Sequence, residues 1–246
     1  EQQGRNVDID ARDERWAREL PPIPIEGGRV GGRITDAQGR FNVNSLLDGR
    51  GRIDAVALAR FERLLAAVGI APDAAQAVVD WLDDNAETTY PRGAEDDYYA
   101  GLERPYRAAN APLATASELR LVRGIGADAW AALAPHVTAL PGRTAINVNT
   151  ASTAVLRAVV PGLDAAGAET LVEELGDEPV EDVASFVEHP LVRGARVETE
   201  GLDVGSRHFR VRIDVEMGPI VYTLYSWLRR DENGRSVVLR RSRTPS

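Results

Sequence analysis

The sequence predicts an α+β fold in which one antiparallel sheet carries a large helical insertion. Hydrophobic residues alternate with polar residues near both ends of the chain, at 22–44 and 206–242. Between them, from residue 45 to about residue 190, hydrophobic residues recur at helical spacing. The N-terminal strands are too few to be stable alone, so we expect both ends to share one sheet. The expected domains are 1–44, an inserted helical domain at 45–200, and 201–246.

The first element that the sequence predicts is a polar helix over residues 5–20, with a few apolar positions such as Trp16. Pro21 and Pro22 are expected to end this helix, because proline lacks the N–H group that a helix interior needs. Short extended pieces follow as far as Asn44. These pieces are the expected first strands of the sheet.

One short phrase occurs twice and is predicted to start helical segments. RFNVNSLL begins at Arg40 and INVNTAST begins at Ile146, and both contain Asn-Val-Asn before Ser or Thr. Ser45 and Thr150 are predicted helix caps, because their side-chain oxygens can accept hydrogen bonds from free backbone N–H groups. The first copy is then the point where the chain leaves the sheet. The second is a new helix start inside the insertion.

The C-terminal segment is predicted to form the remaining strands. Residues 207–217 alternate between polar and apolar side chains, and residues 220–230 form a more apolar strand. Asn233 and Gly234 follow, and this dipeptide is the strongest short signal for a hairpin turn. Residues 236–242 are the expected return strand.

Composition excludes several classes of function. The formal net charge is −9, which disfavours a nucleic-acid or anionic-membrane partner. There is no cysteine, so disulfides, thiolate zinc sites and a cysteine nucleophile are excluded. No G-x-S-x-G motif frames a serine, and no H-E-x-x-H motif is present. We therefore expect no enzymatic activity and no catalytic residues.

Two segments of the helical insertion resemble helix-hairpin-helix units, which bind DNA in some proteins. The expected hairpins are Gly124-Ile125-Gly126 and Pro161-Gly162-Leu163. The helix after the second hairpin is strongly acidic and would repel a phosphate backbone. Its acidic residues are Glu169, Glu173, Glu174, Asp177 and Glu178. We interpret both units as compact helical packing motifs.

An acidic segment between the helices is the best candidate for a binding site. Asp83, Asn85 and Glu87 occupy alternate positions, which lets a loop direct several oxygens toward one point. Oxygen ligands of this kind are typical of calcium sites, and the alternative is a solvated acidic loop. Thr88 replaces the turn glycine of an EF-hand, so the segment is not an EF-hand. The carboxylates of the segment are Asp80, Asp83, Asp84, Glu87, Glu95, Asp96 and Asp97.

Several phrases, in the same order, resemble the K-type minor pseudopilins of type II secretion systems (GspK- and XcpX-like proteins). These phrases are ITDAQGRFNVNSLL, WLDDN with GAEDDYY, YRAANAPLATASELRLVRGI, and INVNTAS. The resemblance spans nearly the whole chain. It implies a pilin-like fold, with an N-terminal helix packed on an antiparallel sheet and an inserted α-domain. It also implies structural calcium in that α-domain.

The resemblance further implies a calcium ligand set, a location and partners. It places ligands at Asp83, Asn85, Glu95 and Asp96, with Asp84, Glu87 and Asp97 as possible substitutes. Relatives often have Asp where this chain has Asn85. The family is anchored in the bacterial inner membrane by an N-terminal hydrophobic helix that this sequence lacks. The resemblance therefore implies that the chain is the periplasmic part. It also implies that residues 1–44 contain a remnant of that helix.

The function that the resemblance implies is structural. Such a protein sits at the tip of the secretion pseudopilus with the I and J minor pseudopilins, and the H-type minor and G-type major pseudopilins are further candidate partners. The alternative is a nucleic-acid-binding protein of the competence type, which contains similar helix-hairpin-helix units. The negative charge and the flanking sheet argue against that alternative, so we expect no nucleic-acid partner.

Overall fold

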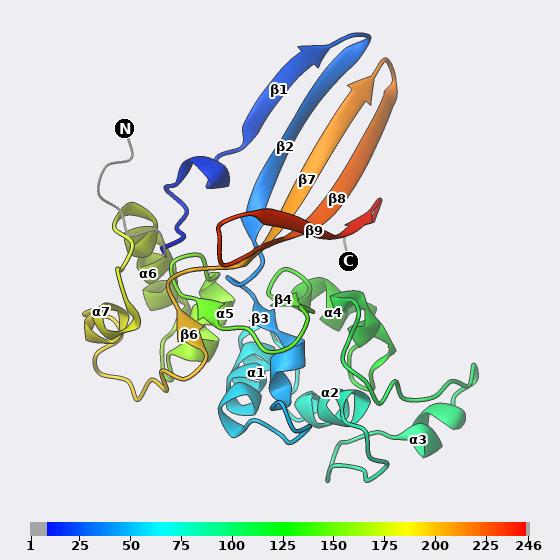
Figure 1. Ribbon diagram of the computed structural model, residues 1–246. Helices are drawn as coiled ribbons and strands as arrows, with labels where there is room; N and C mark the ends of the chain where they lie inside the picture. The colour runs from blue at the N-terminus through cyan, green and yellow to red at the C-terminus, as the bar shows by residue number, and fades with distance from the viewer. Residues whose placement is uncertain (1–8, 245–246) are drawn as a thin grey trace.

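A computed structural model describes residues 9–244 of the chain. Its largest sheet has five strands in the order β1-β2-β7-β8-β9, and all neighbouring pairs are antiparallel. The strands are β1 (Leu20–Ile25), β2 (Gly28–Asp36), β7 (His208–Met217), β8 (Ile220–Arg230) and β9 (Ser236–Ser242). The pairing of β2 with β7 joins the two ends of the chain in one sheet, as predicted (Figure 1). The proposed domain boundaries at 44/45 and 200/201 stay predictions.

The polar helix predicted at residues 5–20 is wrong where the structure describes it. Residues 9–19 contain only a 3-10 turn, η1 (Arg15–Ala17), and β1 begins at Leu20. Pro21 and Pro22 lie inside β1. This is allowed because β1 is at the edge of the sheet, where a missing N–H group breaks no internal ladder bond. Residues 5–8 of the predicted helix lie outside the described residues.

The two faces of the sheet differ in chemistry. Residues that pair directly across strands share a face, and Val30, Val215 and Tyr222 form one such row. Ile213 and Leu224 form the next row on the same apolar face. The opposite face carries mainly arginines and aromatic residues, as in the row of Thr35, Arg210, Trp227 and Arg240. The turn between β8 and β9 contains Gly234 at φ +74°, which confirms the predicted hairpin.

The helical insertion consists of two units that are built alike. In unit one, residues 41–138, strand β3 (Phe41–Asn42) pairs in parallel with β4 (Val137–Thr138). In unit two, residues 146–203, strand β5 (Ile146–Asn147) pairs in parallel with β6 (Leu202–Asp203). Each unit therefore begins and ends with a strand of a two-residue parallel ladder, and its helices come between the two strands in the sequence.

The helices of unit one are η2 (Val43–Leu46), α1 (Ala55–Ala67), α2 (Ala74–Leu82), α3 (Asp96–Ala100), η3 (Ala116–Leu121) and α4 (Ala127–Leu133). Those of unit two are α5 (Thr153–Val159), α6 (Ala165–Asp177) and α7 (Val183–Glu188). The predicted caps Ser45 and Thr150 are wrong. Asp54 caps α1 and Ser152 caps α5, each through a side chain that accepts from a backbone N–H group.

The repeated Asn-Val-Asn phrases perform the same structural task in the two units. In each, the first asparagine accepts the N–H group of the second, which makes a local turn. The second asparagine then holds a distant backbone segment through both its amide nitrogen and its oxygen. Asn44 bonds to the N–H and C=O groups of Leu113, and Asn149 bonds to those of Val180.

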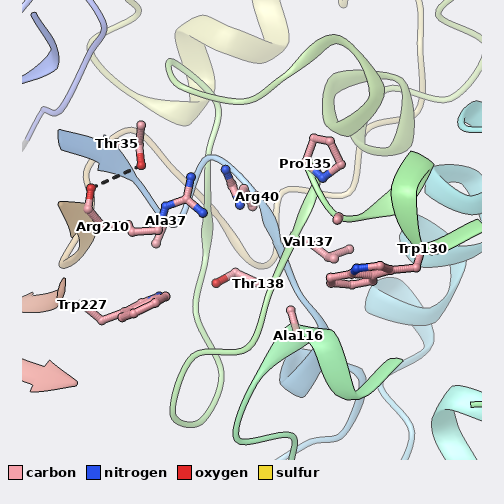
Figure 2. A pocket seen from close by; sticks show the side chains of 11 residues that line it. Thr35, Ala37, Arg40, Ala116, Trp130, Pro135, Val137, Thr138, Arg210 and Trp227 are labelled. Atoms are coloured by element: carbon pink, nitrogen blue, oxygen red, sulfur yellow. Dashed lines mark hydrogen bonds between the residues drawn. The ribbon is translucent and has the colours of Figure 1, made fainter. Parts of the chain in front are cut away.

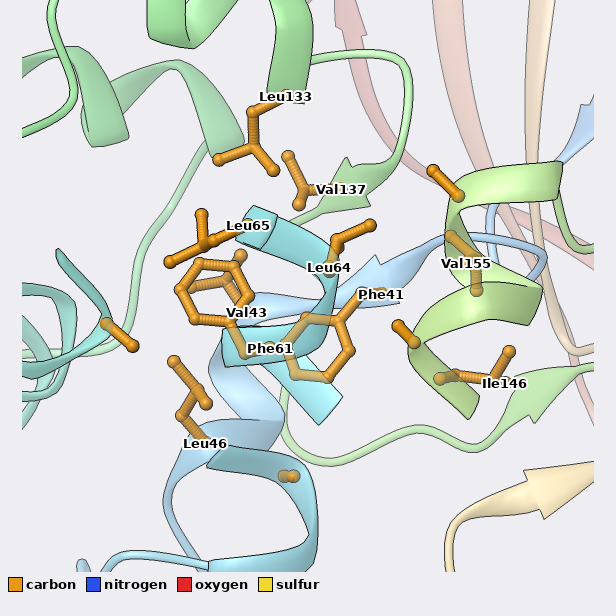
Figure 3. Packing of buried hydrophobic residues seen from close by; sticks show 14 of the residues in the cluster. Phe41, Val43, Leu46, Phe61, Leu64, Leu65, Leu133, Val137, Ile146 and Val155 are labelled. Atoms are coloured by element: carbon orange, nitrogen blue, oxygen red, sulfur yellow. The ribbon is translucent and has the colours of Figure 1, made fainter. Parts of the chain in front are cut away.

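The hydrophobic core lies in the helical insertion. Apart from Ile9, every member of the buried cluster lies between Phe41 and Val204. Phe41 stacks on Phe61 of α1 with ring centroids 5.2 Å apart, and Val155 of α5 faces the same interior (Figure 3). The upper part of the sheet, toward the β1–β2 and β7–β8 turns in Figure 1, contributes nothing to this cluster. Figure 1 shows no α-helix of the described chain over either face of that part.

A buried polar cluster joins the sheet to unit two. The carboxylate of Asp36, at the end of β2, accepts hydrogen bonds from Asn147, Thr150 and Ser206. Burial raises the pKa of Asp36, and the bonds from Ser206 and Thr150 oppose that rise. Asp10 bonds to the N–H group of Ser206 and pairs with Arg230. Residues from three distant parts of the sequence are therefore fixed relative to one another.

Candidate functional site

The acidic segment forms a loop between α2 and α3 in unit one. Asp80 and Asp83 lie on the last turn of α2 and at its end, three residues apart and therefore on the same side of the helix. Glu95 immediately precedes α3. All three carboxylates are buried, and Asp80 is fully so. The ends of the loop thus bring negative charge into the protein interior.

Asp80 closes the loop. Both of its carboxylate oxygens lie 3.1 Å from the N–H group of Thr89. Gly93 packs directly against it, since a Cβ atom at position 93 would lie 2.1 Å from Oδ2 of Asp80. Asp80 was not among the predicted ligands. Its position one helical turn before Asp83 is the signal in the sequence that could have identified it.

Glu95 carries a buried carboxylate without hydrogen bonds from residues 9–244. Both oxygens of its carboxylate are buried and have no hydrogen-bond partner among the described residues. Burial, together with the smaller effect of the charges of Asp80, Asp83 and Asp96, raises the pKa of Glu95 to about 7. The pKa of Asp83 is also raised, first by burial, although the N–H group of Asn85 donates to its carboxylate at 3.2 Å. A cation beside these groups would offset both effects.

The remaining predicted ligands lie on the solvent side of the loop or are already bonded. Asp96 is half-buried, accepts from the N–H group of Ala108 at 3.0 Å, and lies 3.9 Å from the guanidinium of Arg107. Asn85 is exposed, and its side-chain oxygen accepts from the N–H group of Glu87 at 2.6 Å. Asp84, Glu87 and Asp97 are exposed as well. The structure therefore brings Asp83 and Glu95 together with Asp80, and leaves the others at the rim.

The residues present fit a hard cation in their chemistry but do not form a closed ligand set. Across residues 9–244, no group of three or more His, Cys, Asp or Glu side chains is arranged so that it could hold a metal ion. The unpartnered Glu95 carboxylate and the neighbouring Asp83 are nevertheless the oxygen donors that calcium prefers. Behind the loop, Trp81, Tyr99 and Tyr106 pack edge to face or stacked and hold its ends in place.

The two structural units coincide with two matches to known families. Both matched models describe the type II secretion system (T2SS) protein K; one covers residues 39–142 and the other residues 146–205. The chain belongs to the type II secretion system protein K family. The boundary between the two matches falls between β4 and β5, where unit one ends and unit two begins.

Protein K relatives match nearly the whole chain. The type II secretion system protein K of Pseudomonas aeruginosa is 36% identical over 239 residues, which cover 95% of this chain and 71% of that protein. The protein K of Aeromonas hydrophila is 32% identical, and the match covers 93% of this chain and 75% of that protein. Membership of the protein K family thus rests on nearly the whole chain.

A solved protein also shares the fold. A chain in the crystal structure of the GspK-GspI-GspJ complex from the type 2 secretion system of enterotoxigenic Escherichia coli superposes with a TM-score of 0.83. It is 27% identical, and the superposition covers 98% of this chain and 89% of that one. This match includes the sheet as well as both protein K units. No helix among the described residues is long and apolar enough to cross a membrane.

Proposed function

We propose that this chain is a structural, non-catalytic subunit at the tip of a type II secretion pseudopilus, where it assembles with the I- and J-type minor pseudopilins. The observation that carries the proposal is the match over 98% of the chain to a protein solved in a GspK-GspI-GspJ complex. A subunit of this kind functions on the periplasmic side of the inner membrane. Export across the outer membrane is the process that it serves.

The apolar face of the sheet supports an assembly role. Ile220 and Tyr222 on this face are 50% and 53% exposed. Ile23, Ile25 and Met217 extend the same exposed patch across the sheet. Exposed apolar patches of this kind are rare on monomers and are typical of protein–protein contacts. We assign this face to packing within the pseudopilus tip.

The nucleic-acid alternative has no support in the electrostatics of the second hairpin. The acidic side chains of α6, including Glu169 and Glu173, are exposed on the helix that follows Gly162. Their charge would repel a phosphate backbone. Fluorescence anisotropy of labelled duplex DNA should therefore stay flat as the protein is added near physiological salt. A salt-sensitive micromolar isotherm would favour the alternative.

The assembly proposal is tested by mixing the chain with the soluble domains of the I and J pseudopilins from the same organism. Size-exclusion chromatography with light scattering should show a species with the mass of one copy of each protein. The I and J domains together, without this chain, are the control. A mixture that elutes as this chain alone plus a separate I–J species would contradict the assembly role.

We also propose that the loop at residues 80–97 binds calcium and that the ion is structural. The support is the buried, unpartnered carboxylate of Glu95 next to Asp83, with Asn85 and Asp96 at the rim. When bound, calcium would supply a positive charge that six to eight oxygen ligands can surround. Its role would be to hold the ends of α2 and α3 together.

The calcium proposal predicts a separation of two effects in thermal melting. Calcium should raise the melting temperature of the wild type more than magnesium does, relative to EDTA, because binding to the folded loop stabilises it. Glu95→Gln should melt no lower than the wild type in EDTA, because it removes an unpaired buried charge, yet it should lose most of the calcium shift. Glu103→Gln, an exposed change nearby, is the matched control. Equal calcium shifts in all three proteins would exclude the site.

A further inference from the structure

A cavity of about 350 Å³ lies where the sheet meets unit one. The sheet contributes Thr35, Arg210 and Trp227 to its wall, and α4 contributes Trp130. Arg40 enters from the segment between β2 and β3 (Figure 2). The cavity is separate from the acidic loop, and none of its lining residues has a role in the calcium proposal.

Two cations share this cavity without an anionic partner. Figure 2 shows the side chains of Arg40 and Arg210 extending toward one another. Among residues 9–244, neither guanidinium forms an ion pair or a hydrogen bond to another side chain. The guanidinium of Arg210 lies over the ring of Tyr225, 5.9 Å from the ring centroid. The described lining contains no aspartate or glutamate.

The surroundings of Arg40 disfavour its positive charge. Burial, together with the smaller effect of the positive charges of Arg210 and Arg33, lowers the pKa of Arg40 to about 10. Asp36 opposes this effect, but its carboxylate is already engaged by Thr150 and Ser206. An external anion would relieve the repulsion between the two guanidiniums.

The shape and the walls of the cavity define the anion. A guanidinium presents its N–H groups in a planar fork that matches the two oxygens of a carboxylate. The remaining wall is largely apolar, with the indole rings of Trp130 and Trp227 and the side chains of Ala116 and Val137. A phosphate would need polar partners around all of its oxygens, whereas a carboxylate on an apolar group needs them at one end only. The volume lies at the lower end of the range for small-ligand pockets.

We propose that this cavity binds a carboxylate carried on an apolar group, with Arg40 and Arg210 holding the carboxylate and the two tryptophans packing on the apolar part. The carboxylate has two possible sources, a small organic acid or an acidic side chain of a protein segment. The basic and aromatic face of the sheet continues from the cavity. There, Arg240 lies 4.4 Å from the ring centroid of Trp227, in the same row as Arg210.

Calorimetric titration of the full chain with matched probes tests the proposal. The probes are phenylacetate with phenylacetamide as its neutral control, and the capped tetrapeptide Gly-Phe-Glu-Gly with its Gln counterpart. At least one carboxylate probe should bind, and neither neutral probe should. Binding of phenylacetate as tight as that of the peptide identifies a small acid as the source. Binding of the peptide alone identifies a protein segment.

Variants identify the cavity as the site. Arg40→Gln and Arg210→Gln should each weaken binding by about tenfold or more, because each removes a charge-assisted pair of hydrogen bonds. Arg235→Gln, in the exposed turn before β9, makes the same change in net charge and should bind like the wild type. A carboxylate probe that binds should also raise the melting temperature of the wild type, a measurement that needs no variant.

Four outcomes would overturn the proposal. They are binding of neither carboxylate probe at millimolar concentration, equal binding of the neutral probes, tighter binding of phenyl phosphate than of phenylacetate, and wild-type affinity in both folded arginine variants.

Discussion

Asn44 is buried, and its side chain is hydrogen-bonded entirely to backbone groups far away in the sequence. Its amide nitrogen donates to the carbonyls of Leu113 and Leu140 at 3.0 Å, and its oxygen accepts from the N–H group of Leu113 at 2.8 Å. These bonds hold the segment before η3 and the segment after β4 against the start of unit one. Asn149 makes the corresponding pair of bonds to Val180 in unit two.

Replacing Asn44 should therefore cost more stability than its size suggests. Asn44→Ala leaves one N–H and two C=O groups of the backbone without partners in the interior, and each such group costs about 1–3 kcal/mol. We expect a loss of roughly 2–4 kcal/mol in the free energy of unfolding, measured by urea denaturation. Asn233→Ala, in the exposed hairpin turn, should change it by less than about 0.5 kcal/mol. Similar losses in both variants would contradict the role of Asn44.

His208 predicts a pH dependence of stability. Its ring is buried with Nδ1 3.1 Å from the side-chain oxygen of Gln38, and burial lowers its pKa below 6.5, as do the charges of Arg229 and Arg207. The unfolded chain therefore binds a proton near pH 6.5 that the folded chain binds only at lower pH. This contribution to stability is present above pH 6.5 and is lost as the pH falls, by at most about 1.4 kcal/mol per pH unit.

The variant His208→Gln isolates this contribution. Glu95 acts in the opposite direction, because its raised pKa makes its contribution fade as the pH rises from about 4.5 through about 7. Glu95 is unchanged in the variant, so the difference between wild type and variant at each pH removes it. Denaturation between pH 7.5 and pH 5.5, in EDTA, should show a smaller loss on acidification for the variant. Parallel curves would show that His208 does not titrate differently in the folded chain.

At the residue scale, the sequence identified part of the candidate site. Asp83 and Glu95 were predicted and lie buried next to each other, because aromatic and apolar neighbours on both sides draw the ends of the loop inward. Asp80 belonged to the acidic segment but was not a predicted ligand, although it lies one helical turn before Asp83, and its contact with Gly93 appears only in the folded loop. Asn85 keeps the alternate spacing that suggested it, yet its oxygen is used within the loop.

At the scale of elements, α6 offers a test of how local sequence stabilises a helix. Asp164 caps its start by accepting the N–H group of Gly167 at 2.7 Å, and Asp177 lies at its end. Asp164→Ala should lower the free energy of unfolding by about 1 kcal/mol, because a cap is lost. Asp177→Ala should leave it unchanged or raise it slightly, because a negative charge at a helix C-terminus is unfavourable. Equal losses from both substitutions would show that the cap does not determine the difference.

The elements that the sequence predicted well are those with strong periodicity. The strands β7 and β8 and the hairpin at Asn233-Gly234 follow the expected pattern. The polar helix at residues 5–20 failed over its described part, since few apolar residues were available to bury one face. The two parallel ladders at β3–β4 and β5–β6 were not foreseen, because two-residue strands carry no period. The repeated Asn-Val-Asn phrase and the two segments that resemble helix-hairpin-helix units were the traces of the internal repeat in the sequence.

At the scale of the whole molecule, the core and the sheet are unequally stabilised. The buried cluster belongs almost entirely to the two units, while the upper sheet exposes apolar side chains on one face and arginines on the other. The polar cluster at Asp36, Asn147 and Ser206 fixes the sheet to unit two. A sheet that is held at one end, and whose apolar face is not covered by an α-helix of residues 9–244 in its upper part, is suited to packing against other subunits.

Two adjacent residues of β8 allow a direct test of the role of the apolar face. Tyr222 lies on the apolar face, and Val221, at 61% exposure, lies on the other. The measurement is titration calorimetry of the soluble I and J pseudopilin domains into the wild type, Tyr222→Asp and Val221→Asp. Tyr222→Asp should weaken binding by about tenfold or more, because its carboxylate would lose its water in the interface without gaining a partner. Val221→Asp should bind like the wild type. Undiminished binding by a folded Tyr222→Asp variant would contradict the assignment of this face to the pseudopilus tip.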